Sequence, residues 1–203
     1  MMKKILLLPA LFLLAGLGHS MDINPYVEAK ITEGWLHVKA RDESSHLSLR
    51  DNMYQGGTLE VGTKLNQFRI GLEGYCNDTA HDNYIIHTGL VDMKIPVELK
   101  SKGFFLNAYW DIPLNEKWKK VKPYIGAGLG YSWLKVSYTA LTTDSRRDHD
   151  LSWNIGLGMA YELNDRIDLV LGYRYEDLGK LKYSEGNADF TNHKMSVGLR
   201  YTF

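Results

Sequence analysis

The chain has 203 residues, a length that suits one domain, and its 24 basic and 24 acidic residues give a net charge of zero at pH 7. This balance excludes a strongly basic nucleic-acid-binding protein, and the single cysteine, Cys76, excludes an intramolecular disulfide. Glycine (19 residues) and tyrosine (13 residues) are frequent, whereas proline (5 residues) is scarce. This composition favours a barrel of β-strands.

The first twenty residues are typical of a secretory signal peptide. Lys3 and Lys4 form a basic start, residues 5–17 are apolar, and Gly18 and Ser20 place small residues three and one positions before the expected cleavage site. A membrane-anchor helix, the alternative, would need a longer apolar run. We therefore expect export, with residues 1–20 removed and residues 21–203 forming the mature domain.

The mature sequence contains segments in which apolar and polar residues alternate with the period of a β-strand. In the longest of them, Ile125, Ala127 and Leu129 alternate with glycines, which leave room inside a wall for long side chains opposite. After the signal, no apolar run is long enough for a transmembrane helix. The expected strands are 25–35, 57–65, 68–75, 104–112, 121–138, 151–163, 167–178 and 193–203. The start of the fourth, near residues 96–102, is indistinct.

The expected connections alternate between short and long. Short turns are predicted at 66–67, 113–120 and 164–166, and longer polar loops at 41–55, 77–83, 142–150 and 185–189. A soluble barrel would carry its apolar residues inside, but here the charged residues share the glycine-bearing face, which must be the crowded inner one. The pattern predicts an all-β fold, an eight-stranded antiparallel up-and-down transmembrane β-barrel with short periplasmic turns and longer extracellular loops. Such a barrel belongs in the outer membrane of a Gram-negative bacterium.

Three segments resemble a known family. Residues 123–131 read Pro-Tyr-Ile-Gly-Ala-Gly-Leu-Gly-Tyr and resemble the fifth strand of the opacity-protein and OmpA-like eight-stranded outer-membrane barrels. Residues 171–175, Leu-Gly-Tyr-Arg-Tyr, and 196–203, Ser-Val-Gly-Leu-Arg-Tyr-Thr-Phe, are similar to the last two strands of that family. The resemblance covers the mature chain, most clearly from Val121 onward. It also implies that Phe203 is the assembly signal read by the barrel-assembly machinery.

Charged residues recur on the predicted inner face. The interior of an eight-stranded barrel is just wide enough to be filled by side chains, and charges buried there must pair. We expect a salt-bridge network that closes the lumen; the alternative is a gated pore. The predicted network comprises Glu28, Lys30, Glu60, Lys64, Arg69, Glu73, Asp111, Glu162, Asp168, Arg174, Glu176, Lys194 and Arg200.

Aromatic residues recur near both ends of the predicted outer face, as expected for rings that sit at the level of lipid headgroups. Core packing and ligand stacking are the alternatives, and the strand alternation argues against the first. The predicted interfacial aromatics are Trp35, Trp110, Trp118, Trp133, Trp153, Tyr161, Tyr175, Tyr201 and Phe203.

Candidate catalytic groups are few. His193 and Ser196 lie three residues apart in one strand, so they should face opposite sides of the wall and not form a dyad. His81 and His149 each stand among aspartates (Asp78 and Asp82; Asp148 and Asp150), but neither stretch has established metal-ligand spacing. We expect no catalytic residue, metal or cofactor.

The sequence thus predicts a monomeric outer-membrane barrel with a structural and surface-interaction role carried by its extracellular loops. A narrow porin-like channel for ions or small solutes is the first alternative, and a lipid-modifying outer-membrane enzyme is the second. The expected partners are outer-membrane lipid and lipopolysaccharide, the barrel-assembly machinery during biogenesis, and a host or cell-surface ligand. Nucleic acid is not among them.

Overall fold

The computed structural model of the chain describes residues 23–42, 45–79, 82–87, 92–139, 143–183 and 186–203. The predicted signal peptide, residues 1–20, lies outside this part. Within it, no helix has the length and apolar character needed to cross a bilayer.

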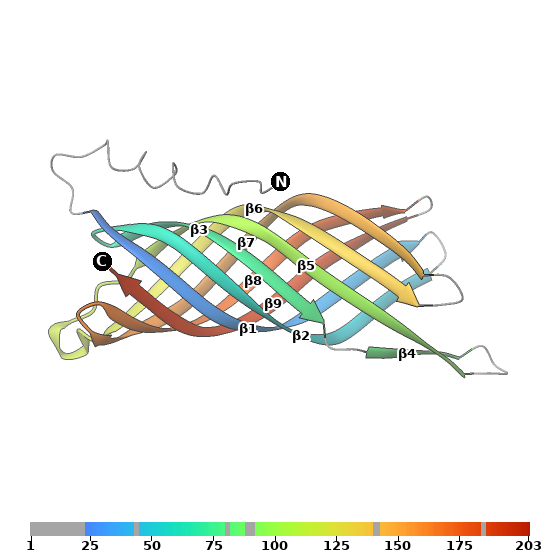
Figure 1. Cartoon of the computed structure of the whole chain (residues 1–203), viewed down its shortest axis with the longest axis horizontal. Coiled ribbons are helices and arrows are strands. Elements are labelled where there is room, and N and C mark those ends of the chain that lie inside the picture. Colours follow the sequence, from blue (N-terminus) through green and yellow to red (C-terminus); the bar gives the residue numbers. More distant parts are fainter. Residues whose placement is uncertain (1–22, 43–44, 80–81, 88–91, 140–142, 184–185) are drawn as a thin grey trace, which may run out of the picture.

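The described residues form one antiparallel sheet that closes on itself (Figure 1). Neighbouring strands follow the order β3-β2-β1-β9-β8-β7-β6-β5-β4, and pairing of β3 with β5 closes the barrel. The short β4 occupies the same position in the barrel wall as β3, because β3 pairs with the second part of β5 and β4 pairs with its first part. The barrel therefore has eight strand positions, as predicted. Its elements are β1 (Ile23–Asp42), β2 (Ser45–Leu65), β3 (Phe68–Thr79), β4 (Asp82–His87), β5 (Asp92–Asp111), a 3₁₀ turn (Glu116–Trp118), β6 (Val121–Thr139), β7 (Thr143–Asn164), β8 (Ile167–Tyr183) and β9 (Gly186–Thr202).

One end of the barrel, here called the turn end, carries the predicted short connections together with the start of β1 and the end of β9 (Figure 1). Asn66 turns the chain from β2 to β3 in the left-handed region, with φ of 57°, which asparagine tolerates better than most residues. At the β7–β8 turn the Asn164 side chain accepts hydrogen bonds from the backbone N–H groups of Arg166 and Ile167, both at 2.9 Å. Local turn chemistry thus fixes the register of these hairpins.

At the opposite end, here called the hairpin end, the strands run further than predicted. Segments 41–55, 77–83, 142–150 and 185–189, predicted as loops, lie largely in strands, and β5 begins at Asp92. The predicted loop limits were therefore wrong. Antiparallel strands that project beyond the membrane satisfy each other's backbone groups, and their side chains need no apolar face. The alternation that marks a membrane strand is then lost, although the strand continues.

The two faces of the wall differ as predicted. In β7, Trp153, Ile155 and Leu157 face outward and are exposed, whereas the alternating Ser152 and Asn154 are buried. The inward glycines also serve as predicted: a Cβ at Gly126 would collide with the Tyr109 ring, and one at Gly158 with the Tyr124 ring. The interior is thus polar and aromatic, and the exterior is apolar.

Candidate functional site

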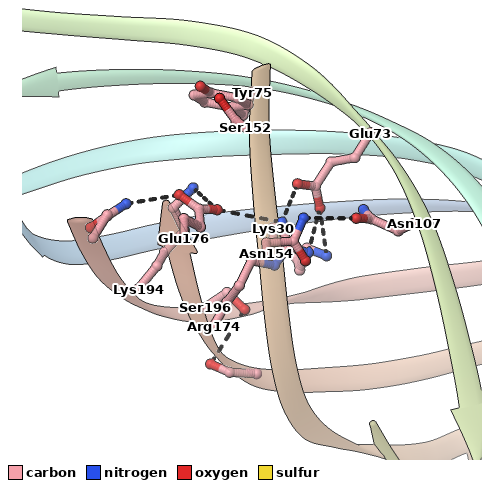
Figure 2. Close-up of polar contacts among 12 residues, drawn as sticks. Lys30, Glu73, Tyr75, Asn107, Ser152, Asn154, Arg174, Glu176, Lys194 and Ser196 are labelled. Atoms are coloured by element: carbon pink, nitrogen blue, oxygen red, sulfur yellow. Dashed lines mark hydrogen bonds and ion pairs between the residues drawn. The ribbon is translucent and has the colours of Figure 1, made fainter. Parts of the chain in front are cut away.

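The centre of the lumen is crossed by a chain of ion pairs. Glu73 on β3 accepts two bonds from Arg174 on β8, at 2.5 and 3.0 Å, and its second oxygen lies 3.2 Å from Nζ of Lys30 (Figure 2). The chain continues on the β8 and β9 side, where Oε1 of Glu176 lies 3.6 Å from Arg174 Nη1 and 2.8 Å from Lys194 Nζ. Since β3 and β8 are not neighbours in the sheet, the Glu73–Arg174 pair joins opposite walls.

A second group of charges leads from this centre toward the turn end. Glu28 binds Lys30 through one oxygen, at 2.6 Å, and Arg200 Nε through the other, at 2.7 Å. Arg200 Nη1 also lies 3.6 Å from Asp168. Glu28 and Arg200 are direct cross-strand partners, so register alone brings this pair together.

The same group reaches the rim of the turn end through a lysine. Lys122 Nζ lies 3.2 Å from Asp168 and 2.8 Å from Glu162. The Lys122 and Glu162 side chains remain 29% and 28% exposed, so this pair is partly exposed to solvent and contributes little to stability.

A third group joins β2, β3 and β5. Arg69 Nε donates to both oxygens of Asp111, at 2.9 and 3.2 Å, and Lys64 Nζ lies 3.3 Å from the same carboxylate. The Arg69 guanidinium also lies over the Tyr109 and Tyr124 rings, 4.4 and 5.0 Å from their centroids. These ring faces add a cation–π attraction to a buried charge.

Glu60 is held by hydrogen bonds from neutral donors. It accepts hydrogen bonds from the hydroxyls of Tyr26 and Tyr109, at 2.5 and 2.6 Å, and from the Asn107 amide, at 3.1 Å. Asn107 also accepts a bond from Asn154 at 3.0 Å, across the intervening strand (Figure 2). Three neutral donors therefore satisfy a carboxylate that has no exposed surface.

Between this asparagine pair lies Gly128, which is the cross-strand partner of both Asn107 and Asn154. A Cβ at Gly128 would collide with the Asn107 side chain and lie 2.7 Å from that of Asn154. The glycine therefore makes room for a hydrogen bond that joins β5 to β7 over β6.

Polar layers continue toward the hairpin end. The Ser132 hydroxyl accepts a hydrogen bond from the Tyr75 hydroxyl at 2.6 Å and another from the Ser152 hydroxyl at 2.7 Å. Asn192 contacts the Tyr54 hydroxyl and donates to Glu176 at 2.8 Å. Hydrogen bonds thus bridge the interior on both sides of the central ion pairs, toward the turn end and toward the hairpin end.

The structure places every charged residue of the predicted network on the inner face. Lys64, Glu162 and Arg174 keep some exposure, and the other members are buried. Sequence reasoning missed Lys122, Asn154 and Asn192 as members. The alternation of side chains along a strand could have placed Lys122 and Asn154 on the inner face, because each lies an even number of positions from other inward residues of its strand. Their partners on distant strands could not have been found in this way.

The predicted interfacial aromatics lie on the outer surface or at the turn end. Tyr201 and Phe203 stack edge to face at the turn end, with centroids 5.1 Å apart, and Trp153 and Tyr175 lie 5.6 Å apart nearer the hairpin end. The remaining members are Trp35, Trp110, Trp118, Trp133 and Tyr161. Their position at lipid headgroups stays a prediction.

The catalytic candidates do not come together. The His193 ring bonds to the Tyr173 hydroxyl at 2.7 Å on the outer face, whereas Ser196 lies on the inner face, 3.5 Å from the carbonyl oxygen of Gly172. Within the described residues, no group of three His, Cys, Asp or Glu side chains could hold a metal ion. The two histidine–aspartate stretches around His81 and His149 lie outside the described side chains.

Comparison with known proteins agrees with this geometry. The family described as outer membrane protein beta-barrel domain matches residues 8–203. Opacity protein V28 of Neisseria gonorrhoeae is 29% identical over 210 residues, covering 90% of this chain and 79% of the relative. Opacity protein opA60 of the same organism is 28% identical over 127 residues, covering 48% of this chain. That match spans about half the length (50%) of opA60.

A solved structure shares the fold. The crystal structure of Neisserial surface protein A superposes with a TM-score of 0.62 at 20% sequence identity, covering 88% of this chain and 97% of that one. With both the architecture and the sequence matched, the turn end is the periplasmic end and the hairpin end is extracellular. The chain belongs to the outer membrane protein beta-barrel domain family and is a β-barrel of the Gram-negative outer membrane that is similar to opacity proteins.

Proposed function

We propose that this protein is a non-conducting outer-membrane barrel that presents its extracellular hairpins to partners at the cell surface. One observation carries the proposal of a closed lumen: the Glu73–Arg174 pair joins strands on opposite walls at 2.5 Å. A water path along the barrel axis would have to pass through this pair.

The surroundings of that pair support closure. Beside Lys30 and Arg174 lies a cavity of about 20 Å³, which is room for about one water molecule. Toward both ends of the barrel, tyrosine and asparagine side chains bridge the walls by hydrogen bonds. A space of this size beside the pair leaves little room for an ion to pass, which supports closure.

Conductance in planar lipid bilayers tests closure. Wild-type protein should give no steady current, whereas Glu73→Ala should leak because it removes the central bridge. Glu162→Gln, which alters the partly exposed rim pair, is the matched control and should stay closed. A large, steady wild-type current would overturn closure and favour the narrow pore for ions or small solutes.

The hairpins support the surface role. The pairing of β6 with β7 continues from Leu129–Trp153 to Thr139–Thr143, so this hairpin projects well past the aromatic residues of the wall. The paired strands extend this hairpin as a regular ribbon as far as Thr139 and Thr143. Opacity proteins are among the relatives that match, which is consistent with a role at the cell surface.

Trimming this hairpin tests the surface role. Residues 136–146 would be replaced by a two-residue turn, and cells carrying the variant would be compared with wild-type cells for attachment to cultured epithelial cells. The variant should keep the heat-modifiable gel mobility of a folded barrel and lose attachment. A folded variant that attaches as well as wild type would contradict the proposal for this hairpin.

We also propose that the protein is not an enzyme. His193 and Ser196 lie on opposite faces of the wall, and opacity proteins are among the matched relatives. Mass spectra of membrane lipids should be unchanged when the purified barrel is added. A new lipid product that disappears with Ser196→Ala would support the lipid-modifying alternative instead.

A further inference from the structure

A second cavity lies inside the turn end of the barrel, between the charged interior and the periplasmic rim. Its volume is about 200 Å³, which is room for several water molecules. Strands β1, β2, β3, β6, β8 and β9 and the β7–β8 turn all contribute to its lining, so the cavity is surrounded by the wall. The lining residues are Asn24, Tyr26, Lys64, Arg69, Lys122, Asp165, Arg166, Asp168, Arg200 and Thr202.

Cations line this cavity both where it is buried and where it opens. Arg69 and Arg200 are almost fully buried, whereas Lys64 and Lys122 keep 30% and 29% of their side chains exposed. The fifth cation of the lining is the exposed Arg166, and the two acids of the lining are the buried Asp168 and the exposed Asp165. Positively charged groups therefore outnumber acids along the cavity surface itself.

The two buried arginines keep hydrogen-bond donors that protein atoms do not use. Arg69 donates through Nε to Asp111, and Arg200 donates through Nε to Glu28. In both arginines Nη2 is buried and finds no hydrogen-bond acceptor among the described residues. A buried donor without an acceptor is costly, so a molecule that brings acceptor oxygens into this cavity would remove that cost.

A tyrosine ring holds the two arginines at the same level of the lumen. The guanidinium carbons of Arg69 and Arg200 lie 5.8 and 5.6 Å from the centroid of the Tyr26 ring. The ring face attracts both cations, but it does not replace an acceptor oxygen. Two like charges are therefore gathered around one ring, at the inner part of the cavity.

The carboxylates beside the cavity are each shared by two cations. Asp111 lies 2.9 Å from Arg69 Nε and 3.3 Å from Lys64 Nζ. Asp168 and Glu28 are shared in the same way, through the contacts given above. These acids neutralise charge, but they leave the Nη2 donors of the arginines unfilled.

The placement of the cations selects among anions. Lys64 stands on β2, Arg69 on β3, Lys122 on β6 and Arg200 on β9, so they approach the cavity from different parts of the wall. A carboxylate has only two acceptor oxygens, and both lie in one plane. A phosphate directs its oxygens toward the corners of a tetrahedron, and both arginine and lysine bind phosphate through charge-assisted hydrogen bonds. The surrounding donors therefore suit a phosphate group better than a carboxylate.

We propose that this cavity binds one phosphate group, with Arg69 and Arg200 donating from its buried side and Lys64 and Lys122 from its rim. The group is supplied either by free phosphate or by a phosphate monoester lipid of the inner leaflet. Bound phosphate joins four strands at the periplasmic end of the barrel. The site is independent of lumen closure and of hairpin binding.

Isothermal titration calorimetry of the mature barrel tests the proposal. Protein refolded in octyl glucoside micelles would be titrated with inorganic phosphate, with dihexanoyl phosphatidic acid and with acetate. Phosphate should bind at one site per barrel, about tenfold or more tightly than acetate. Binding of phosphatidic acid alone would support the phosphate site and identify the lipid as its source. Binding of neither phosphate compound, or acetate binding as tight as that of phosphate, would overturn the proposal.

Variants test the assigned cavity. The double change Lys64→Gln, Lys122→Gln removes two partly exposed cations and should weaken phosphate binding about tenfold or more. Thr202→Leu fills part of the cavity and leaves every cation in place. It should weaken binding severalfold, and it keeps the test decisive if the double variant fails to fold. Unchanged phosphate binding by either folded variant would overturn the proposal.

A matched control lies at the same end of the barrel. Lys117 and Lys119 are exposed, in and just after the 3₁₀ turn, and neither lines the cavity. The double change Lys117→Gln, Lys119→Gln removes the same charge and should leave phosphate binding unchanged. A loss as large as that of the first double variant would reduce the effect to net charge at this end and overturn the assigned site.

Discussion

The inner and outer faces of this barrel are built from the same strands, yet they follow opposite packing rules. On β7, Leu157 points outward and is 59% exposed within the protein, whereas Asn154, three residues earlier on the inner face, is 4% exposed and bonded to Asn107. Lipid chains adapt to any apolar shape, so the outer residue needs hydrophobicity and no particular partner. The inner residue needs a partner at a fixed distance, because an unpaired polar group in a dry interior is costly.

This difference predicts two kinds of sensitivity to mutation. Inner positions should respond to the loss of a specific partner, and outer positions to their depth in the membrane. Four changes test the contrast through the free energy of unfolding, measured by urea titration in lipid vesicles.

Glu73→Ala should have the largest effect. It leaves Lys30 and Arg174 in the lumen without the carboxylate that bridges them, and removal of one partner from a buried pair costs about 3–5 kcal/mol. The double variant Glu73→Ala, Arg174→Ala should be less destabilised than the sum of the single variants. Additive losses would show that the cross-lumen pair contributes no coupling.

Leu157→Arg should come next. Leu157 lies midway between Tyr161 and Trp153 on the outward face of β7, and an arginine at the bilayer midplane costs about 2–4 kcal/mol. Leu163→Arg, just before the β7–β8 turn, is the control and should cost about 0–1 kcal/mol because it lies near the interface. Equal losses for the two variants would mean that depth does not govern the outer wall.

Gly128→Ala compares an inner glycine with an outer one. The added methyl group would displace the Asn107 amide, and overpacking of this kind costs about 1–3 kcal/mol. Gly74→Ala adds the same group to open space on the outer face and should change stability by no more than about 0.5 kcal/mol. The contrast between the faces would fail if Gly74→Ala were the more damaging change.

Glu162→Gln should have the smallest effect. Its pair with Lys122, at 2.8 Å, is partly open to water, and exposed pairs contribute about 0.2–1 kcal/mol. The loss should shrink further at high salt, since screening weakens exposed charges most. A loss as large as that of Glu73→Ala would show that the rim is as dry as the lumen centre.

The membrane-spanning part of this fold could be read from the sequence, residue by residue. Strand alternation identified which residues of β7 face lipid, and the turn residues around Asn66 and Asn164 marked the ends of hairpins. Both signals are local, because a strand has a period of two and a tight turn has its own chemistry. The extracellular hairpins were missed because water on both sides removes the alternation.

The alternation of the sequence by itself determined the barrel, the side of the wall on which each membrane residue lies, and the membership of most of the charged interior. Only the tertiary structure decided which inner side chains pair with each other. Glu73 meets Arg174, 101 residues away on a non-neighbouring strand, whereas Glu60 is held by tyrosine hydroxyls and an asparagine amide. Partner choice depends on barrel closure, on the register of every strand between the partners, and on glycines that let side chains pass. These are properties of the closed sheet and not of any one segment.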